Sequence, residues 1–345
     1  MMKKLKLFIL AVLISNTVYS QYSKLQNFAA KIKVDYPYGD LLFDGTFLYG
    51  MSSVGGADGL GLIFRVKPDG SELKILLEFT GDNGSFPNGG LISDGTFLYG
   101  MTRRGGRKEM GVIFKIKTDG TGYLTLLSFT GINGSNPQGS LISDGSFLYG
   151  MTYDGGKSDF GVIFKIKRNG TGFLKLLDFT GENGTNPTGS LLSDGTFLYG
   201  MTPVGGLNAL GNIFRILPDG TEFTDIYDFS GLDGSHPTGT LITDNTFLYG
   251  MASEDGTIGY GAVFKILPDG SEYEQIYDFE SPSDPRGTLI AEGTTLYGMI
   301  PIDGTNGRGT LFKIKTNGTG FFKPVKLAGG IGASPYGSLL FTNPE

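Results

Sequence analysis

This chain has one histidine and no cysteine, so that histidine and the carboxylates are its candidates for acid–base chemistry. The histidine, His236, follows Ser235 in a loop, and the matching loops of other copies of a repeat carry Phe86, Asn136 and Asn186. One histidine cannot form a catalytic triad by itself, and no GxSxG nucleophile motif is present in a strand–turn–helix context. His236 is therefore expected to be a surface loop residue rather than a catalytic base.

The loop that carries His236 belongs to a unit of about fifty residues that occurs six times, at 39–88, 89–138, 139–188, 189–238, 239–286 and 287–336. The third copy has four apolar segments, 139–143, 147–152, 162–167 and 173–179, separated by turn and loop residues. A period of this length with several short strands is typical of propellers. We predict an all-β, six-bladed β-propeller of four-stranded antiparallel blades, with strands a, b, c and d. A seven-fold ring with one incomplete blade is the alternative.

The polarity of the strands indicates how each blade is oriented. Strand b is apolar on both faces, as expected of a sheet packed between two others, whereas Lys165 and Lys167 end strand c and Lys175 and Asp178 lie in strand d. Strand a is therefore expected at the axis and strand d at the rim, where sheet edges meet water. In this topology the b–c loops and the d–a loops project from one face, which we call the loop face.

The most uniform residues of the repeat are explained by folding. Tyr149 and Met151, which have counterparts in every copy, are expected to pack between blades, and Gly150 is expected to let neighbouring blades approach closely. Asp144-Gly145 is a two-residue hairpin signal.

The b–c loops, in contrast, differ sharply between copies. The first two residues of these loops read Ser53-Val54, Arg103-Arg104, Tyr153-Asp154, Pro203-Val204, Ser253-Glu254 and Pro301-Ile302. A face that varies on a repeated frame is a usual place for function, although drift in exposed loops would produce the same pattern. The candidate ligand-binding residues are Arg103, Arg104, Tyr153, Asp154, Glu182, His236 and Glu254. No catalytic residue is assigned.

No metal or cofactor is predicted. The absence of cysteine excludes a thiolate site, and the Asp-Gly pairs are explained by turn geometry. The oxygen-rich d–a loop 81–85 leaves calcium as the alternative, but its Asp82 is replaced by Ile132, Glu182 and Leu232 in other copies.

Charge and the first residues indicate where the protein acts. The net charge of −6 and the lack of a basic footprint exclude the nucleic-acid-binding class. Residues 1–20 have lysines, an apolar run and a small residue at the end, as in a signal peptide, so that residues 21–345 form a single propeller domain. No later segment is long and apolar enough to span a membrane. We expect a secreted, extracellular or periplasmic monomer, with cell-surface association as the alternative.

The segments outside the six copies resemble single strands. Residues 22–28 match strand d and residues 334–341 match strand a. Since Pro324 lies in the sixth strand d, where proline requires an edge or a bulge, we expect residues 22–28 to supplement or replace that strand.

Residues 94–120, DGTFLYGMTRRGGRKEMGVIFKIKTDG, carry a pattern that recurs in all copies. It resembles the GloVer tandem repeat of secreted bacterial proteins over residues 39–336, and the strand order is similar to that of NHL-type blades. The resemblance implies export and a propeller-like array, and brings no established activity or catalytic residues. Members of that group are named for varied C-terminal anchors, and this chain departs from that pattern because residues 341–345 contain no apolar tail.

Three functions fit the sequence. The first is a binding module for a glycan or an extracellular protein on the loop face, and the second is a structural spacer of the cell envelope. The third is a glycan hydrolase that uses loop carboxylates such as Asp154, Glu182, Asp233 or Glu254. Such hydrolases need two carboxylates about 5–10 Å apart.

Overall fold

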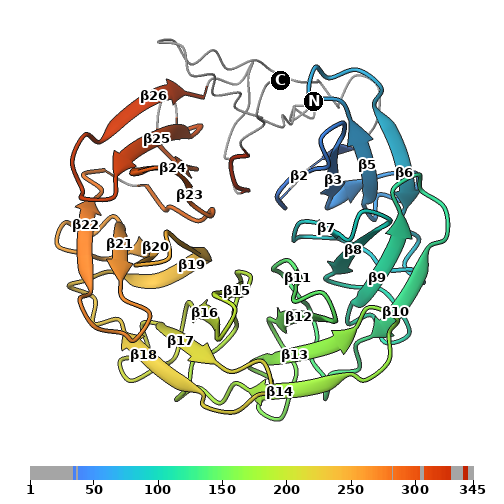
Figure 1. Cartoon of the computed structure of the whole chain (residues 1–345), viewed down its shortest axis with the longest axis horizontal. Coiled ribbons are helices and arrows are strands. Elements are labelled where there is room, and N and C mark those ends of the chain that lie inside the picture. Colours follow the sequence, from blue (N-terminus) through green and yellow to red (C-terminus); the bar gives the residue numbers. More distant parts are fainter. Residues whose placement is uncertain (1–33, 36–37, 282, 304–306, 328–336, 341–345) are drawn as a thin grey trace, which may run out of the picture.

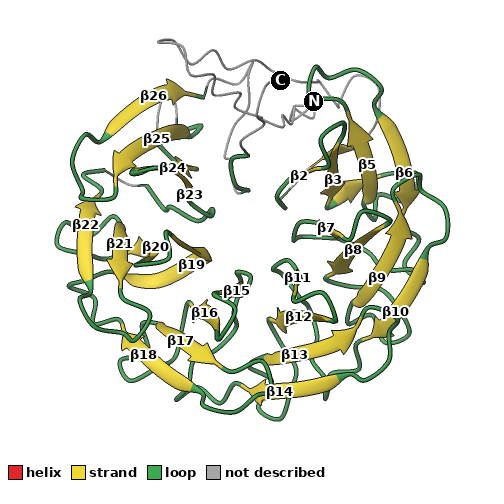
Figure 2. Ribbon diagram, viewed as in Figure 1, coloured by secondary structure: helices red, strands yellow, loops and turns green. Residues whose placement is uncertain are grey.

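The computed structural model describes residues 34–35, 38–281, 283–303, 307–327 and 337–340. Every regular element in these ranges is a β-strand (Figure 2), and none of the described residues form a helix that could cross a membrane. Six sheets of four antiparallel strands stand around a central axis (Figure 1). The predicted all-β propeller with six four-stranded blades is therefore confirmed.

Each blade has the strand order a-b-c-d. The a strands are β2 (Leu42–Phe43), β7 (Ile92–Ser93), β11 (Ile142–Ser143), β15 (Leu192–Ser193), β19 (Ser235–Thr243) and β23 (Ile290–Glu292). The b strands are β3 (Leu48–Ser52), β8 (Phe97–Thr102), β12 (Phe147–Thr152), β16 (Leu198–Thr202), β20 (Leu248–Glu254) and β24 (Thr295–Ile300). The a strands line the axis in Figure 1, as predicted.

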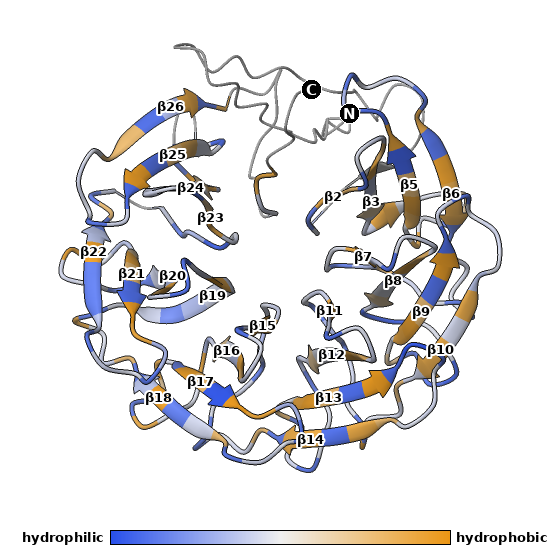
Figure 3. Ribbon diagram, viewed as in Figure 1, coloured by the Kyte–Doolittle hydropathy of each residue, from blue (hydrophilic) through white to orange (hydrophobic). Residues whose placement is uncertain are grey.

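The outer half of each blade consists of strands c and d. The c strands are β5 (Leu62–Val66), β9 (Val112–Lys117), β13 (Val162–Lys167), β17 (Asn212–Ile216), β21 (Ala262–Ile266) and β25 (Thr310–Lys315). The d strands are β6 (Lys74–Glu78), β10 (Leu124–Ser128), β14 (Leu174–Asp178), β18 (Thr224–Asp228), β22 (Glu274–Asp278) and β26 (Phe322–Lys326). The d strands form the rim, where β22 is coloured largely hydrophilic in Figure 3. The short strand β1 (Val34–Asp35), which precedes the first copy, pairs antiparallel with β4 (Val54–Gly55) in the b–c loop of the first blade.

The core lies between blades rather than inside them. Tyr149, Met151 and Phe179 of the third blade form one buried cluster with Leu198 and Phe214 of the fourth. The predicted packing role of the Tyr and Met positions is confirmed. The role predicted for Gly150 is wrong, because a Cβ there would lie 2.7 Å from Phe164 Cζ in strand c of the same blade. The glycine makes room for that ring and not for a neighbouring blade.

The turn between strands a and b begins one residue later than predicted. In the third blade Ser143 pairs with Leu148, and Asp144 N–H donates to Phe147 O at 3.3 Å. The two central turn residues are thus Gly145, with φ of 96°, and Ser146. Asp144 precedes the turn.

Strand d has a bulge in every blade, which explains Pro324. In β26 the register shifts between Leu311 and Lys313, because Leu311 pairs with Val325 and Lys313 pairs with Phe322. Pro324 is one of the residues without a partner in this ladder, so its missing N–H costs no ladder hydrogen bond. The expected edge or bulge position is confirmed, whereas residues 22–28 lie outside the described part of the chain.

Residues 337–340 occupy a further place at the axis, between the sixth and first blades (Figure 1). The Ser338 N–H donates to Asp40 Oδ1 at 2.9 Å. Leu339 packs with Met299 of the sixth blade, and Leu340 packs against Phe64 of the first. This segment continues the arrangement of the a strands, although it is not a strand itself.

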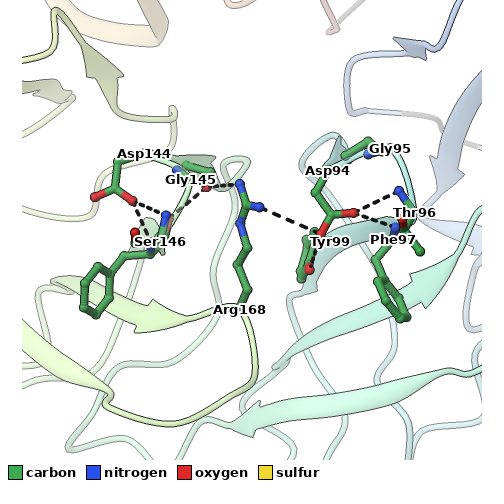
Figure 4. A network of polar contacts seen from close by, with 12 residues as sticks. Asp94, Gly95, Thr96, Phe97, Tyr99, Asp144, Gly145, Ser146 and Arg168 are labelled. Carbon is green, nitrogen blue, oxygen red and sulfur yellow. Dashed lines mark hydrogen bonds and ion pairs between the residues drawn. The ribbon is translucent and has the colours of Figure 1, made fainter.

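The face opposite the loop face contains a polar network between two blades (Figure 4). Arg168 Nη2 donates to Ser143 Oγ at 3.0 Å in its own blade, and Nη1 lies 3.9 Å from Asp94 Oδ2 in the preceding blade. Asp94 also accepts hydrogen bonds from the Thr96 and Phe97 N–H groups and from the Tyr99 hydroxyl.

Candidate binding face

The loop face is built from interlocking d–a and b–c loops. In the loop between blades 2 and 3, Gly131 and Gly134 exchange backbone hydrogen bonds of 3.2 and 2.9 Å. Gly156 N–H of the following b–c loop donates to Gly131 O at 2.8 Å, and Asn136 N–H donates to Met110 O of the preceding b–c loop at 2.9 Å. This d–a loop therefore lies between two b–c loops, and the prediction that both kinds of loop share a face is confirmed.

A polar cavity of about 390 Å³ opens at the axis of this face. Its wall contains the residue that precedes the first glycine of each copy: Tyr38, Asn88, Gln138, Thr188, Thr238 and Arg286. The charged side chains of the described lining are Asp40, Arg103 and Arg286. Of these lining residues, only Arg103 was predicted from the sequence. Comparing the residue before each repeated glycine would have identified the remaining variable positions.

A belt of side-chain hydroxyls holds the axial ends of neighbouring blades together. The N–H groups of Gly90, Ser140 and Ser190 donate to the hydroxyl oxygens of Ser140, Ser190 and Thr240 at 2.7, 2.8 and 3.0 Å. Thr240 N–H continues the belt to Thr288 at 3.1 Å. Backbone donors next to the cavity are satisfied in this way, so that the variable side chains around them are not needed for this purpose.

Asp40 occupies a belt position with a carboxylate instead of a hydroxyl. Its side chain is accessible from the cavity, but the cavity wall surrounds it, and this enclosure raises the pKa of Asp40. The hydrogen bonds from Ser338 act in the opposite direction and stabilise the charged form.

Three of the predicted residues lie together beside the cavity. Arg103 Nε donates to Asn136 Oδ1 at 3.0 Å, and Asn136 Nδ2 donates to Asp154 Oδ2 at 2.9 Å. Asn186 Nδ2 donates to Tyr153 O at 2.9 Å and lies 3.4 Å from Asp154 Oδ1. This chain of contacts joins the second and third blades and fixes the Asp154 carboxylate between two amides.

His236 lies in a separate cluster with Ser235, Glu254 and Asp255. Its Nδ1 is 2.9 Å from Ser235 Oγ and 3.6 Å from Glu254 Oε2, while the Ser235 hydroxyl donates to Asp255. In a catalytic triad the serine and the acid use opposite ring nitrogens, whereas here both approach Nδ1. Ser235 is also fully buried. The arrangement is a structural cluster in which Glu254 remains exposed, and it lacks the geometry of a triad.

Arg104 and Glu182 are not brought into either cluster. Arg104 pairs through its backbone with Ser85. The side chains of Arg104 and Glu182 are exposed. Among the described residues, no side-chain hydrogen bond or ion pair involves these two groups.

The hydrolase hypothesis requires a carboxylate pair, and Asp233 does not provide one. Its carboxylate accepts hydrogen bonds from the Tyr227 hydroxyl and the Ser230 N–H, which hold the d–a loop. A carboxylate pair that was not predicted from the sequence lies on β18, where burial and the neighbouring Asp228 raise the pKa of Asp225 to about 6. The pair sits in the outermost strand of its blade. There Asp228 Oδ1 accepts the Leu207 N–H at 2.7 Å.

The part of the chain that the structure describes contains no group of three or more His, Asp or Glu side chains that could hold a metal ion. In the loop considered for calcium, Asn83 Oδ1 accepts the Thr80 N–H at 2.8 Å. That amide oxygen therefore stabilises the loop itself.

Solved structures with different activities share this fold. An oligogalacturonate lyase in complex with manganese matches with a TM-score of 0.58 and 13% identity, over 93% of this chain and 85% of that one. A chain of a nidogen/laminin complex gives 0.52 and 18%, over 81% and 94%. The GH74 enzyme of Niastella koreensis gives 0.56 and 16%, over 85% of this chain and 45% of the enzyme. Identities this low show the fold alone.

A search of curated proteins found no significant match. The family model of the Gloeobacter/Verrucomicrobia repeat, in contrast, matches residues 12–167 and 141–284, which together exceed half of the chain. The match agrees with the resemblance seen in the repeated sequence pattern. The chain belongs to the Gloeobacter/Verrucomicrobia repeat family.

Proposed function

We propose that this protein is an exported binding module that holds a glycan or a protein on its loop face. One observation carries the proposal: side chains at matched positions around the axial cavity differ from blade to blade, although the backbone that presents them is repeated. The position before each axial glycine carries Tyr38, Asn88, Gln138, Thr188, Thr238 and Arg286.

A second set of matched positions supports the same view. Phe86, Asn136, Asn186, His236 and Asp284 all have positive φ between 45 and 54°, yet their side chains have different chemistry. Non-glycine residues in this region of φ are uncommon and are best tolerated as asparagine or aspartate. The backbone conformation therefore accounts for Asn136, Asn186, His236 and Asp284, whereas Phe86 has no such explanation and is the member of the set that fits adaptation to a ligand.

The alternatives account for fewer of these features. A spacer has no use for a polar cavity with two arginines at its wall. A glycan hydrolase needs an acid and a second carboxylate at the substrate, whereas Asp154 is held by two amides and the Asp225–Asp228 pair belongs to an outer strand. Binding is therefore the function that the face supports best.

Export is part of the proposal. The first twenty residues combine Lys3, Lys4 and Lys6 with an apolar run and end at Ser20, which is the order of a secretion signal. N-terminal sequencing of the protein recovered from outside the cytoplasm should give Gln21 as the first residue. Recovery of an intact chain that begins at Met1 would contradict this point.

The binding proposal is tested with the mature protein on a glycan array and against a library of random peptides displayed on phage. The variant Arg103→Ser/Arg286→Thr takes residues that occur at the equivalent positions, Ser53 and Thr238, so the fold should tolerate it. We expect this variant to lose at least tenfold in affinity, because two charged donors leave the cavity wall. Arg168→Thr, which copies Thr118 on the opposite face, is the matched control and should bind like the wild type. Failure of both probes to bind the wild-type protein would contradict the proposed function.

A further inference from the structure

Exposed apolar side chains are concentrated on the loop face. Eleven large hydrophobic side chains are exposed in the described part of the chain, and eight of them belong to b–c or d–a loops. The other three, Leu124, Leu174 and Phe322, lie at the start of outer strands. Five of the eight lie in the fourth and fifth blades and the d–a loop that joins them: Val204, Leu207, Leu232, Ile258 and Tyr260. We call these five residues the apolar sector.

The loops that carry the apolar sector are in direct contact. The d–a loop with Leu232 is held on one side by the His236 N–H, which donates to Leu210 O at 2.9 Å. On the other side Gly256 N–H donates to Gly231 O at 2.9 Å. The loop of Leu232 therefore lies between the loop of Leu207 and that of Ile258, and the sector spans adjoining loops.

Folding does not require these leucines. The position of Leu207, which is 84% exposed, carries Ala57, Arg107 and Lys157 in the first three blades. Its loop keeps the same left-handed residue two positions later, with φ of 58, 61 and 58° at Glu109, Asp159 and Ala209. Polar residues thus support the same loop conformation at this position.

Polar residues also occur at the position of Leu232 in other copies. Leu232 is 80% exposed, and Asp82 and Glu182 occupy its position in other d–a loops. Adjoining exposed apolar side chains on a soluble surface mark a place of interaction rather than a requirement of the fold.

A basic loop lies on the same face, in the second blade. Arg103, Arg104, Arg107 and Lys108 follow one another in its b–c loop, with Glu109 as the only acid there. Within the described residues, none of these four cations forms an ion pair. The whole chain has a net charge of −6, so the loop is a local exception that favours an acidic group opposite it.

We infer that the loop face binds a protein through the apolar sector, and that this partner carries acidic side chains opposite the basic loop. The inference rests on the proposed function and specifies its ligand class. A glycan presents hydroxyl groups, which would lose hydrogen bonds against leucine and isoleucine side chains. A protein buries apolar side chains at the centre of an interface and surrounds them with polar contacts, which fits this combination.

The test uses the mature full-length protein and a random peptide library displayed on phage. Enriched peptides should combine apolar residues with Asp or Glu, and their Kd should be measured by titration calorimetry. The variant Leu207→Lys/Leu232→Glu copies Lys157 and Glu182 of neighbouring loops and should weaken binding at least tenfold. Arg107→Ala/Lys108→Asp, which copies Ala57 and Asp58, should weaken binding and reduce its salt dependence.

The control Leu124→Lys/Leu174→Glu removes two exposed leucines of the rim and copies Lys74 and Glu274. It should change Kd by less than twofold. Circular dichroism verifies the fold of each variant, and the single variant Leu232→Glu serves if the double variant fails to fold.

The outcomes separate this inference from the proposed function. Peptides that bind the Leu207→Lys/Leu232→Glu variant as tightly as the wild type would overturn the inference and leave the proposed function standing. Glycan binding without any peptide binding would do the same. If neither probe binds, both are wrong. Sedimentation that shows a wild-type dimer, lost in the variant, would identify a second copy of the chain as the occupant and overturn the partner proposed here.

Discussion

The hydroxyl of Tyr149 donates a hydrogen bond of 2.7 Å to Oδ2 of Asp144, the residue that precedes the a–b turn. The other oxygen of Asp144 accepts the N–H groups of Ser146 and Phe147, both at 2.7 Å. One carboxylate therefore ties the turn to the buried tyrosine of strand b. The same bond is found at Asp44–Tyr49, Asp94–Tyr99, Asp194–Tyr199 and Asp244–Tyr249.

Loss of this hydroxyl should destabilise the protein measurably. Tyr149→Phe keeps the buried ring and removes one charge-assisted hydrogen bond, so the free energy of unfolding should fall by about 1–2 kcal/mol. Urea unfolding followed by circular dichroism measures the change. Tyr153→Phe on the loop face is the control and should stay within about 0.5 kcal/mol of the wild type. Equal effects of the two variants would contradict a structural role for the Tyr149–Asp144 bond.

The turn aspartates should also make the fold sensitive to acid. Partial burial acts to raise the pKa of Asp144, but the hydrogen bonds from Phe147, Tyr149 and Ser146 outweigh it, and the net pKa is lowered. The pKa values of Asp44, Asp94, Asp194 and Asp244 are lowered in the same way. Since the folded-state pKa lies below the unfolded value of 3.8, these groups stabilise the fold above that pH and lose this contribution as pH falls through the folded-state pKa.

Urea unfolding between pH 5 and pH 2.5 checks this expectation. The wild type should lose stability steadily below pH 4, and Asp144→Asn should lose less over the same range, because one of the titrating groups is gone. A variant whose stability falls as steeply as that of the wild type would show that Asp144 does not contribute.

The tyrosines titrate at the opposite end of the pH range. Burial and the Asp94 carboxylate raise the pKa of Tyr99 to about 12, because the charged phenolate is disfavoured next to an anion in a partly buried site. Ultraviolet titration at 295 nm should therefore show that the tyrosines bonded to the turn aspartates remain protonated at pH 11 while exposed tyrosines ionise. Ionisation of all tyrosines near pH 10 in the folded protein would contradict the Asp–Tyr geometry.

The architecture could be predicted from the sequence because the same pattern of apolar segments and turns occurs in six copies. Apolar segments at fixed spacing predicted four strands per blade, and the polarity of Lys175 and Asp178 in strand d predicted the rim. The Asp–Tyr bond was missed because the Asp-Gly pair was interpreted as a complete turn, whereas the structure places the turn at Gly145 and Ser146. The pattern of a hairpin indicates that a turn exists more reliably than which residue begins it.

The Asp225–Asp228 pair could not be predicted from regular strand geometry. Residues three apart in a strand point to opposite faces. In β18, however, Ile213 pairs with Tyr227 and Phe214 pairs with Asp225, so Ile226 forms a bulge that brings the two carboxylates to one side. The signal in the sequence was the comparison of copies, since Lys175 and Gln275 occupy the position of Asp225 and contact Asp178 and Asp278.

Replacing Asp225 should stabilise the protein at neutral pH. Its folded-state pKa of about 6 lies above the unfolded value of 3.8, so the contribution of Asp225 is fully present below pH 4 and is lost as pH rises through 6. Asp225→Gln copies Gln275 and keeps an acceptor for Asn212, which donates to Asp225 in the wild type. We expect a gain of about 1 kcal/mol at pH 7 and little change at pH 4, because the side chain is only half buried.

Urea unfolding of both proteins at pH 4, 5, 6 and 7 measures this difference. Asp219→Asn, which copies Asn169 in an exposed c–d turn, is the control and should show no growing advantage between pH 4 and pH 7. A constant difference between Asp225→Gln and the wild type across this range would mean that Asp225 does not titrate near pH 6.

The axial glycines should be the least replaceable residues of the repeat. A Cβ on Gly139 would lie 2.1 Å from Gly189 O and 2.6 Å from Gly189 C in the next blade, and both contacts are with backbone that cannot rotate away. A Cβ on Gly89 would likewise lie 2.2 Å from Gly139 O. A methyl group at one of these positions would therefore displace the backbone of the neighbouring blade at the axis. Gly139→Ala should therefore cost on the order of 3 kcal/mol or prevent folding.

Gly145 provides the contrast, because it also has a special conformation but no neighbour. Its φ is 96°, and nothing lies within 4 Å of an added Cβ. Gly145→Ala should cost only about 1–2 kcal/mol from backbone strain, and Gly145→Asn less, since Asn245 already occupies the equivalent turn with φ of 71°. Thermal unfolding of the three variants should give the order Gly145→Asn, Gly145→Ala, Gly139→Ala from most to least stable. If Gly139→Ala were as stable as Gly145→Ala, the blades would have to separate at the axis without loss, and the close backbone contact there would not hold the ring together.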